Sequence, residues 1–281
     1  MMNLRKIRKE ANRLAVKNAA KIIPIYVFVG IVSLLVMFVS NEVISIFLSL
    51  LLATITHAYI VSSLKAVEGE DLHVKKDAIV GFTDYGRLFP SYFMRKLVIN
   101  IVSIILMLPT IYLIYSKSGI MVNDVITWLQ IIIVSGIEDI ASFSNVSQYL
   151  TTPIVFASFT FASIMSTILS FGLAMMPYLV EKQDISWTEA IMKSWKMMNG
   201  HKKELFILRI SYAGQMIFIY ITIQLITNIL SFSLYLATFS SLVLSIYLPI
   251  IFYQPHFEMA NALFYKELIN KEEHPDLFAL L

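Results

Sequence analysis

The sequence predicts an all-α membrane protein, a polytopic bundle of six transmembrane helices with both termini on the cytoplasmic side and amphipathic helices at the inner face. Three observations predict it. Hydrophobic residues make up 58% of the 281 residues and charged residues 15%, against about 45–50% and about 25% in soluble domains. Six apolar segments approach the roughly 20 residues that a helix needs to cross a bilayer. Lys and Arg residues are concentrated in alternate connections between these segments, as in inner-membrane proteins.

The predicted spans and their connections account for nearly the whole chain, so we expect residues 1–281 to form a single membrane domain. Pro153 suits the first turn of the fourth span, and Pro109 lies near the end of the third, where a neighbouring helix or water can satisfy the freed carbonyl. The six spans are expected at about 22–39, 43–64, 96–115, 153–180, 205–230 and 235–253.

The orientation follows from the basic residues. The segment before the first span and the connections after the second and fourth carry most of the Lys and Arg, whereas the opposite connections hold Lys117 beside several acidic residues. Basic residues favour the cytoplasmic side, so both termini are predicted to lie in the cytoplasm and the protein in an inner membrane. Because no small-residue cleavage site follows the first span, we expect it to be retained.

The outer connection 116–152 contains an apolar run at 125–134. About ten residues are too few to cross a bilayer as a helix. We therefore expect an interfacial or a re-entrant helix, with Trp128 near the lipid headgroups.

Three amphipathic or polar segments are predicted at the inner face. Residues 1–21 form a basic amphipathic helix whose flank suits anionic lipid; its apolar stripe is Leu4, Ile7, Ala11 and Leu14. A second helix begins at the capping box Ser186 to Glu189 and ends near Gly200; its apolar side is Trp187, Ile191, Trp195 and Met198. Residues 254–281 are expected to form a cytoplasmic helix and tail.

Two inner connections resemble each other. Val67-Glu68-x-x-Asp71-Leu72 followed by Ala78-Ile79 has the same pattern as Val180-Glu181-x-x-Asp184-Ile185 followed by Ala190-Ile191. One interpretation is a pair of parallel repeats related by an axis along the membrane normal. The alternative is that an inner interface selects the same short motifs twice.

Small residues recur every four positions in the fourth span, which lets another helix approach closely. This predicts a packing seam, within the molecule or between two copies, formed by Ser158, Ala162, Ser166, Ser170 and Ala174.

Ionisable residues near the spans are the candidates for function, because they are costly in lipid. Arg209 follows Glu204 in the fifth span and is placed to reach lipid phosphate or Glu258. His201 and Lys202 follow a glycine at a helix boundary, where an anion can bind. For all five residues, lipid contact or structural pairing is the simpler interpretation and a substrate site the alternative.

Several chemistries lack their required residues. The chain has no cysteine, and it contains no H-E-x-x-H, G-x-S-x-G or Walker sequence. No carboxylate lies near the middle of a predicted span, which disfavours an ion-coupled carrier with a buried acidic relay. We therefore expect no enzyme activity, no cofactor, no metal and no nucleic-acid partner.

A family resemblance covers most of the chain. It is carried by Met176-Pro177-Tyr178, Ser186-x-x-Glu189-Ala190-Ile191-x-x-Ser194, Met198-x-Gly200-His201-Lys202-x-Glu204-Leu205-Phe206, Gly81-Phe82-x-x-Tyr85-x-Arg87-x-Phe89, and Pro255 with Ala262-x-Phe264-Tyr265-x-Glu267-Leu268. These motifs resemble the bacterial integral membrane family of unknown function numbered 975. The resemblance implies a multi-pass membrane protein with no established activity. Residues 116–152 and the Gln254-Pro255-His256 segment depart from the family pattern.

Two functions fit these observations. The first is a non-enzymatic membrane protein that acts through anionic lipids of the inner leaflet, a second copy of itself or another membrane protein, in envelope maintenance or bacteriocin self-immunity. The second is a transporter of a small or lipid-like anionic solute, with Arg209 and His201 meeting the anion.

Overall fold

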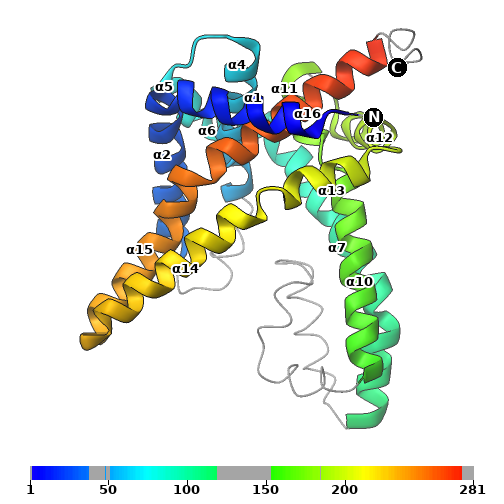
Figure 1. Cartoon of the computed structure of the whole chain (residues 1–281). Helices are drawn as coiled ribbons and strands as arrows, with labels where there is room; N and C mark the ends of the chain where they lie inside the picture. The colour runs from blue at the N-terminus through cyan, green and yellow to red at the C-terminus, as the bar shows by residue number, and fades with distance from the viewer. Residues whose placement is uncertain (1, 38–47, 49–50, 119–152, 184, 274–281) are drawn as a thin grey trace.

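A computed structural model describes residues 2–37, 48, 51–118, 153–183 and 185–273 (Figure 1). Within these ranges the chain is helical and contains no strand. The helices are α1 (Leu4–Lys17), α2 (Ala19–Met37), α4 (His57–Glu68), α5 (Val74–Ala78), α6 (Val80–Thr83), α7 (Tyr85–Ser118), α10 (Pro153–Gly172), α11 (Met176–Gln183), α12 (Trp187–Met197), α13 (Lys202–Ile210), α14 (Ala213–Ile229), α15 (Leu234–Phe252) and α16 (Gln254–Glu273), with a 3-10 turn at Leu230–Phe232.

The helices divide into a head region and two arms. The first and last described helices, α1 and α16, lie at the head, which also contains α4, α5, α6, α11, α12, α13 and the beginning of α7 (Figure 1). From the head, α7 and α10 extend as one packed pair and α14 and α15 as another. α2 packs along α15. We call these pairs the α7–α10 arm and the α14–α15 arm.

Five helical segments of the described chain are long and apolar enough to cross a membrane, which indicates a multi-pass membrane protein. They are Ala19–Val36, Tyr85–Pro109, Phe159–Gln183, Lys202–Phe232 and Tyr235–Phe252. The predicted span at 43–64 begins outside the described residues, as do the apolar run at 125–134 and the tail after 273.

The bounds of three predicted spans need correction. α7 begins at Tyr85 instead of near 96 and continues through Pro90, so Arg95 and Lys96 lie on the helix itself. The fourth span is interrupted at 173–175, between α10 and α11, and the fifth at 211–212, between α13 and α14. Each interruption leaves backbone groups without their regular helical partners, a feature that membrane proteins tolerate where the backbone is buried in protein.

The apolar stripe of α1 is buried against protein. Ile7, Ala11 and Leu14 are buried in the main core, and α1 packs along α16. Asn3 caps the helix by accepting a hydrogen bond from the Lys6 amide at 3.0 Å. An amphipathic stripe fits a protein surface as well as a lipid surface, and here α16 supplies the apolar partner. The α1 residues Arg5, Lys9, Arg13 and Lys17 are exposed.

The second amphipathic helix begins and ends close to its predicted positions. The Ser186 hydroxyl accepts from the Glu189 amide at 3.4 Å, and Gly200 follows the helix with a φ of +79°. Its most buried face contains small residues: Ser194 donates to the Gly172 carbonyl at 3.0 Å, and Ala190 is fully buried. Trp195 lies directly on Gly172, where an added Cβ would come within 2.3 Å of the indole. This face therefore holds α12 against the junction of α10 and α11.

The two segments with similar motifs meet in the head region. Lys182 pairs with Glu68, and Arg87 donates to the Val180 carbonyl at 2.8 Å. The first contact joins the ends of α4 and α11, and the second joins α7 to α11. The internal repeat itself stays a prediction.

Candidate functional site

The head region contains a group of ionisable and aromatic side chains that come from four helices. Arg95 and Tyr92 lie on α7, Tyr178 on α11, Arg209 on α13 and Glu258 on α16. Arg95 lies within electrostatic range of Tyr92, Tyr178 and Arg209, and Arg209 lies within that range of Glu258 and Tyr178. We call these five residues the interior arginine cluster.

Arg209 lies in the last turn of α13, two residues before the interruption that begins at 211. Its guanidinium carbon lies 5.0 Å from the centre of the Phe171 ring and 5.6 Å from that of Phe257. Cation–π contacts of this kind stabilise a guanidinium away from water. The Nε atom is buried and has no hydrogen-bond partner, so an N–H donor remains unused inside the protein.

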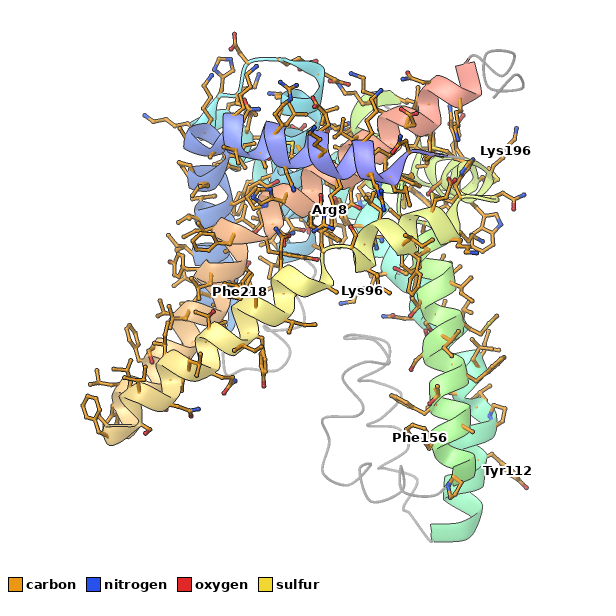
Figure 2. All side chains as sticks on the ribbon, viewed as in Figure 1. Arg8, Lys96, Tyr112, Phe156, Lys196 and Phe218 are labelled. Carbon is orange, nitrogen blue, oxygen red and sulfur yellow. The ribbon has the colours of Figure 1, made fainter. Side chains whose placement is uncertain are left out.

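Arg95 has the same unused donor. Its Nε is also buried without a hydrogen-bond partner, and a second positive charge, Arg209, lies within electrostatic range. Figure 2 shows the next residue of α7, Lys96, between the two arms and below α13. A like-charge pair with unpaired donors in a low-dielectric interior is costly unless an anion compensates it.

Glu258 is the carboxylate of the cluster. Its oxygens accept from Gln254 Nε2 at 2.8 Å and from the Tyr178 hydroxyl at 3.5 Å. Burial raises the pKa of the Glu258 carboxyl, although the positive charge of Arg209 acts in the opposite direction. A carboxyl that burial biases towards its neutral form compensates two guanidinium groups incompletely.

A second polar network lies beside the cluster and shares Tyr92 with it. His57 on α4 is completely buried; its Nδ1 lies 2.8 Å from the Tyr92 hydroxyl and its Nε2 3.0 Å from Glu181. Glu181 also accepts from Arg87 at 3.0 Å. These hydrogen bonds connect α4, α7 and α11 and fix the part of α7 that carries Arg95. The side chains of His57, Glu181 and Arg87 thus have hydrogen-bond partners in this network, whereas the Nε atoms of Arg95 and Arg209 have none.

The five site residues predicted from the sequence separate into three places. Arg209 and Glu258 lie in the interior arginine cluster. A carboxylate oxygen of Glu204 instead lies 2.6 Å from His201 Nδ1, and the other accepts a hydrogen bond from the backbone amide of Met2 at 3.0 Å. Glu204 therefore connects α13 to the residues just before α1. Lys202 lies over the Trp195 ring at 3.7 Å. His201 and Lys202 therefore belong to the beginning of α13 and not to the surroundings of Arg209.

The predicted packing seam lies on α10 and at its C-terminal end. Ala162 is completely buried beside Met107 of α7, and the hydroxyls of Ser166 and Ser103 are 2.6 Å apart. Ser170 is partly buried, Ala174 lies in the main core, and the side chain of Ser158 is outside the described set. Two members of the seam thus face α7 of the same molecule.

Sequence reasoning missed Arg95, Tyr92, Tyr178 and the network around His57 as parts of one site. One signal was available: if the helix is extended back through Pro90, Arg95 becomes a charged residue inside an apolar span. Pro90 concealed it, because proline usually ends a helix. The grouping of α7 with α11 depends on contacts between residues more than 90 positions apart, which no local pattern reveals.

A family model described as a protein of unknown function, DUF975, matches residues 1–272. The chain belongs to this family. The match extends from before α1 to the last turn of α16, so every residue of the interior arginine cluster lies within the DUF975 region. Comparisons with curated proteins and with solved structures give no significant match.

The chemistry that the cluster offers is anion binding. Two guanidinium groups supply planar N–H donors that suit phosphate or carboxylate oxygens. Across the described part of the chain, no group of three His, Asp or Glu residues is arranged to hold a metal ion.

Proposed function

We propose that this DUF975 protein is a non-enzymatic multi-pass protein of the bacterial cytoplasmic membrane that binds an anionic group, carried by a lipid or a lipid-like solute, at its interior arginine cluster. One observation carries the proposal: the buried Nε atoms of Arg95 and Arg209 lack hydrogen-bond partners. Native proteins rarely leave such donors unsatisfied, and charged side chains inside a membrane protein commonly mark a ligand or ion site.

The proposed topology has six spans and cytoplasmic termini. The basic connections support it, and so does the position of α1 and α16, the first and last described helices, at the head region (Figure 1). A C-terminal reporter should accordingly be active only in the cytoplasm. In this orientation the arginine cluster lies near the cytoplasmic ends of the spans, within reach of a headgroup of the inner leaflet.

Native mass spectrometry of the full chain, extracted with its own membrane lipids, tests the binding. We expect an anionic adduct whose mass distinguishes a phospholipid from a free phosphate. The variants Arg95→Gln and Arg209→Gln should each reduce its occupancy by about tenfold or more, the scale of one charge-assisted hydrogen bond. Lys203→Gln, which removes an exposed charge from the same helix as Arg209, should leave occupancy unchanged.

The variants Arg95→Lys and Arg209→Lys control for the possibility that the glutamine variants lose the adduct because they misfold. They keep the charge but lose the planar pair of donors, so the protein should fold and the adduct should weaken. Equal occupancy in the wild type and in both glutamine variants would contradict the proposal.

A carrier of the same anion is the second candidate. It is favoured by the interruptions at 173–175 and 211–212, because discontinuous helices line the substrate sites of many transporters, and the second interruption directly follows the Arg209 turn. In reconstituted vesicles a carrier would move the identified anion across the bilayer, and Arg209→Ala or Glu258→Ala would abolish the movement. A binding protein that acts through lipid or protein partners would show only background movement in all three forms.

A further inference from the structure

The molecule has a second candidate site, separate from the interior arginine cluster, on the α14–α15 arm. A groove of about 690 Å³ runs between these helices and ends beneath α1. Arg8 of α1, Gln215 of α14 and His256 of α16 line it together with apolar residues. Figure 2 shows Arg8 under α1 and Phe218 on α14.

The groove is polar at its head end and apolar along the arm. Gln215 lies in the first turn of α14, whereas Phe218 and Thr222 lie about one and two turns further from the head. On α15, which runs back towards the head, Phe252 and Leu248 line the same groove. The polar end of the groove therefore suits a phospholipid headgroup, and the apolar part along the arm suits its acyl chains.

Two groups at the head end identify the chemistry of the occupant. Arg8 brings a positive charge, and its guanidinium carbon lies 5.2 Å from the centre of the Tyr212 ring, which holds it at the groove. The Oε1 atom of Gln215 is buried and has no hydrogen-bond partner. Arg8 suits a phosphate oxygen, whereas an amide oxygen needs a donor from the ligand.

We propose that this groove binds one anionic phospholipid with a hydroxyl-bearing headgroup, its phosphate on Arg8, its hydroxyl donating to Gln215 and an acyl chain along Phe218 and Phe252. The proposal differs from a general lipid annulus because the charge on Arg8 and the acceptor on Gln215 select a headgroup. It is independent of the interior arginine cluster, which shares no residue with the groove.

Lipid titrations of the purified full chain by native mass spectrometry test the site. The probes are phosphatidylglycerol, phosphatidic acid and phosphatidylcholine with identical acyl chains. Phosphatidylglycerol should bind more tightly than phosphatidylcholine, which has no net charge, and more tightly than phosphatidic acid, which lacks the headgroup hydroxyl. Glycerol phosphate without acyl chains should not compete.

Matched variants separate the contributions. Arg8→Gln should weaken phosphatidylglycerol binding by about tenfold, whereas Arg5→Gln, at an exposed position of the same helix, should not change it. Gln215→Leu should remove the preference for phosphatidylglycerol over phosphatidic acid. Thr222→Trp should fill the groove and reduce binding, whereas Ile221→Trp, at the neighbouring exposed position, should not.

Equal effects of Arg8→Gln and Arg5→Gln, or equal binding of phosphatidylcholine and phosphatidylglycerol to the wild type, would overturn the proposal. The second comparison needs no variant, so it decides the question even if a substitution prevents folding. The two proposals can fail separately. If the Arg95 and Arg209 variants leave the anionic adduct unchanged while phosphatidylglycerol is still preferred at the groove, the arginine cluster is the site that fails. If the adduct depends on these arginines but the groove shows no preference among lipids, the groove is the site that fails.

Discussion

The head region and the two arms use polar residues in opposite ways. In the head, Glu181 shares hydrogen bonds with His57 and Arg87, and the buried Nε atoms of Arg95 and Arg209 have no hydrogen-bond partner. In the arms, the outward side chains are large and apolar, for example Phe218, which is 71% exposed, and Ser103 with Ser166 provides a buried polar contact between helices. The arms therefore present mainly apolar side chains on their outer surfaces, whereas most of the buried ionisable groups lie in the head.

The two regions should also differ in their sensitivity to substitution. Lipid tails are as apolar as the side chains they surround, so an exposed position in an arm tolerates exchange among apolar residues. The head combines close backbone contacts with buried charges, and both are expensive to disturb.

Gly81→Ala should have the largest effect. A Cβ at this position would lie 2.3 Å from the Thr54 carbonyl oxygen and 2.5 Å from the Ile55 Cα, and backbone atoms cannot move aside as a flexible side chain can. We expect a loss of about 3 kcal/mol in the free energy of unfolding. Thermal unfolding of the detergent-purified protein measures it. Gly86→Ala is the matched control, because its added Cβ has no atom within 4 Å; an equal loss in both variants would count against close packing in the head.

Glu181→Gln should cost about 2 kcal/mol, the value of a buried hydrogen bond to a charged group. The substitution keeps the shape of the side chain but removes the charge that His57 and Arg87 share. Chemical denaturation monitored by circular dichroism would detect the change. Glu10→Gln, which breaks the exposed pair with Arg13, should leave the midpoint unchanged. If Glu181→Gln is as harmless as Glu10→Gln, the network around His57 does not hold the head together.

The serine pair of the α7–α10 arm should contribute much less. A double-mutant cycle of Ser103→Ala and Ser166→Ala is expected to give a coupling energy of about 0.6 kcal/mol, the average for hydrogen bonds between membrane helices. Ser170→Ala serves as the control within the predicted seam. A coupling energy comparable to the loss in Glu181→Gln would remove the contrast between arm and head.

The smallest effect concerns pH and the contact between α1 and α16. His256 Nδ1 lies 3.1 Å from Asn12 Oδ1, and burial lowers the pKa of His256 from its ordinary value of 6.5. The folded state therefore resists protonation: the contribution of His256 is complete above about pH 6.5 and declines as the pH falls through the lowered pKa. Melting temperatures across this range should fall slightly in the wild type and less in His256→Gln. His73→Gln, at an exposed histidine, should follow the wild type, and a wild-type melting temperature that rises on acidification would show that the sign is wrong.

Much of the architecture could be predicted because it depends on local patterns. Apolar length predicted membrane helices, and the capping residue Ser186 with the glycine at 200 predicted the bounds of α12. The early start of α7 could not be predicted in the same way, since Pro90 lies inside this helix and proline usually ends a helix. The fate of the α1 stripe was equally undetermined, because lipid and α16 offer the same apolar surface to Ile7 and Leu14.

The site was less predictable than the fold. Arg209 and Glu258 could be selected as charges near lipid, but the grouping of Glu204 with them overlooked its hydrogen bond from the backbone amide of Met2, 202 residues away. Arg95 looked like one of many basic residues at an inner face. Its distinction is a buried donor without a partner, and that property exists only after α7, α11 and α13 have packed.

Anion binding at the interior arginine cluster can be tested by crystallising the full chain with selenate, because anomalous scattering locates the selenium. We expect an anion, either selenate or a native ligand, between the guanidinium groups of Arg95 and Arg209. Selenium peaks confined to surface residues such as Lys202 and Lys203, with no anion density between the two arginines, would contradict it.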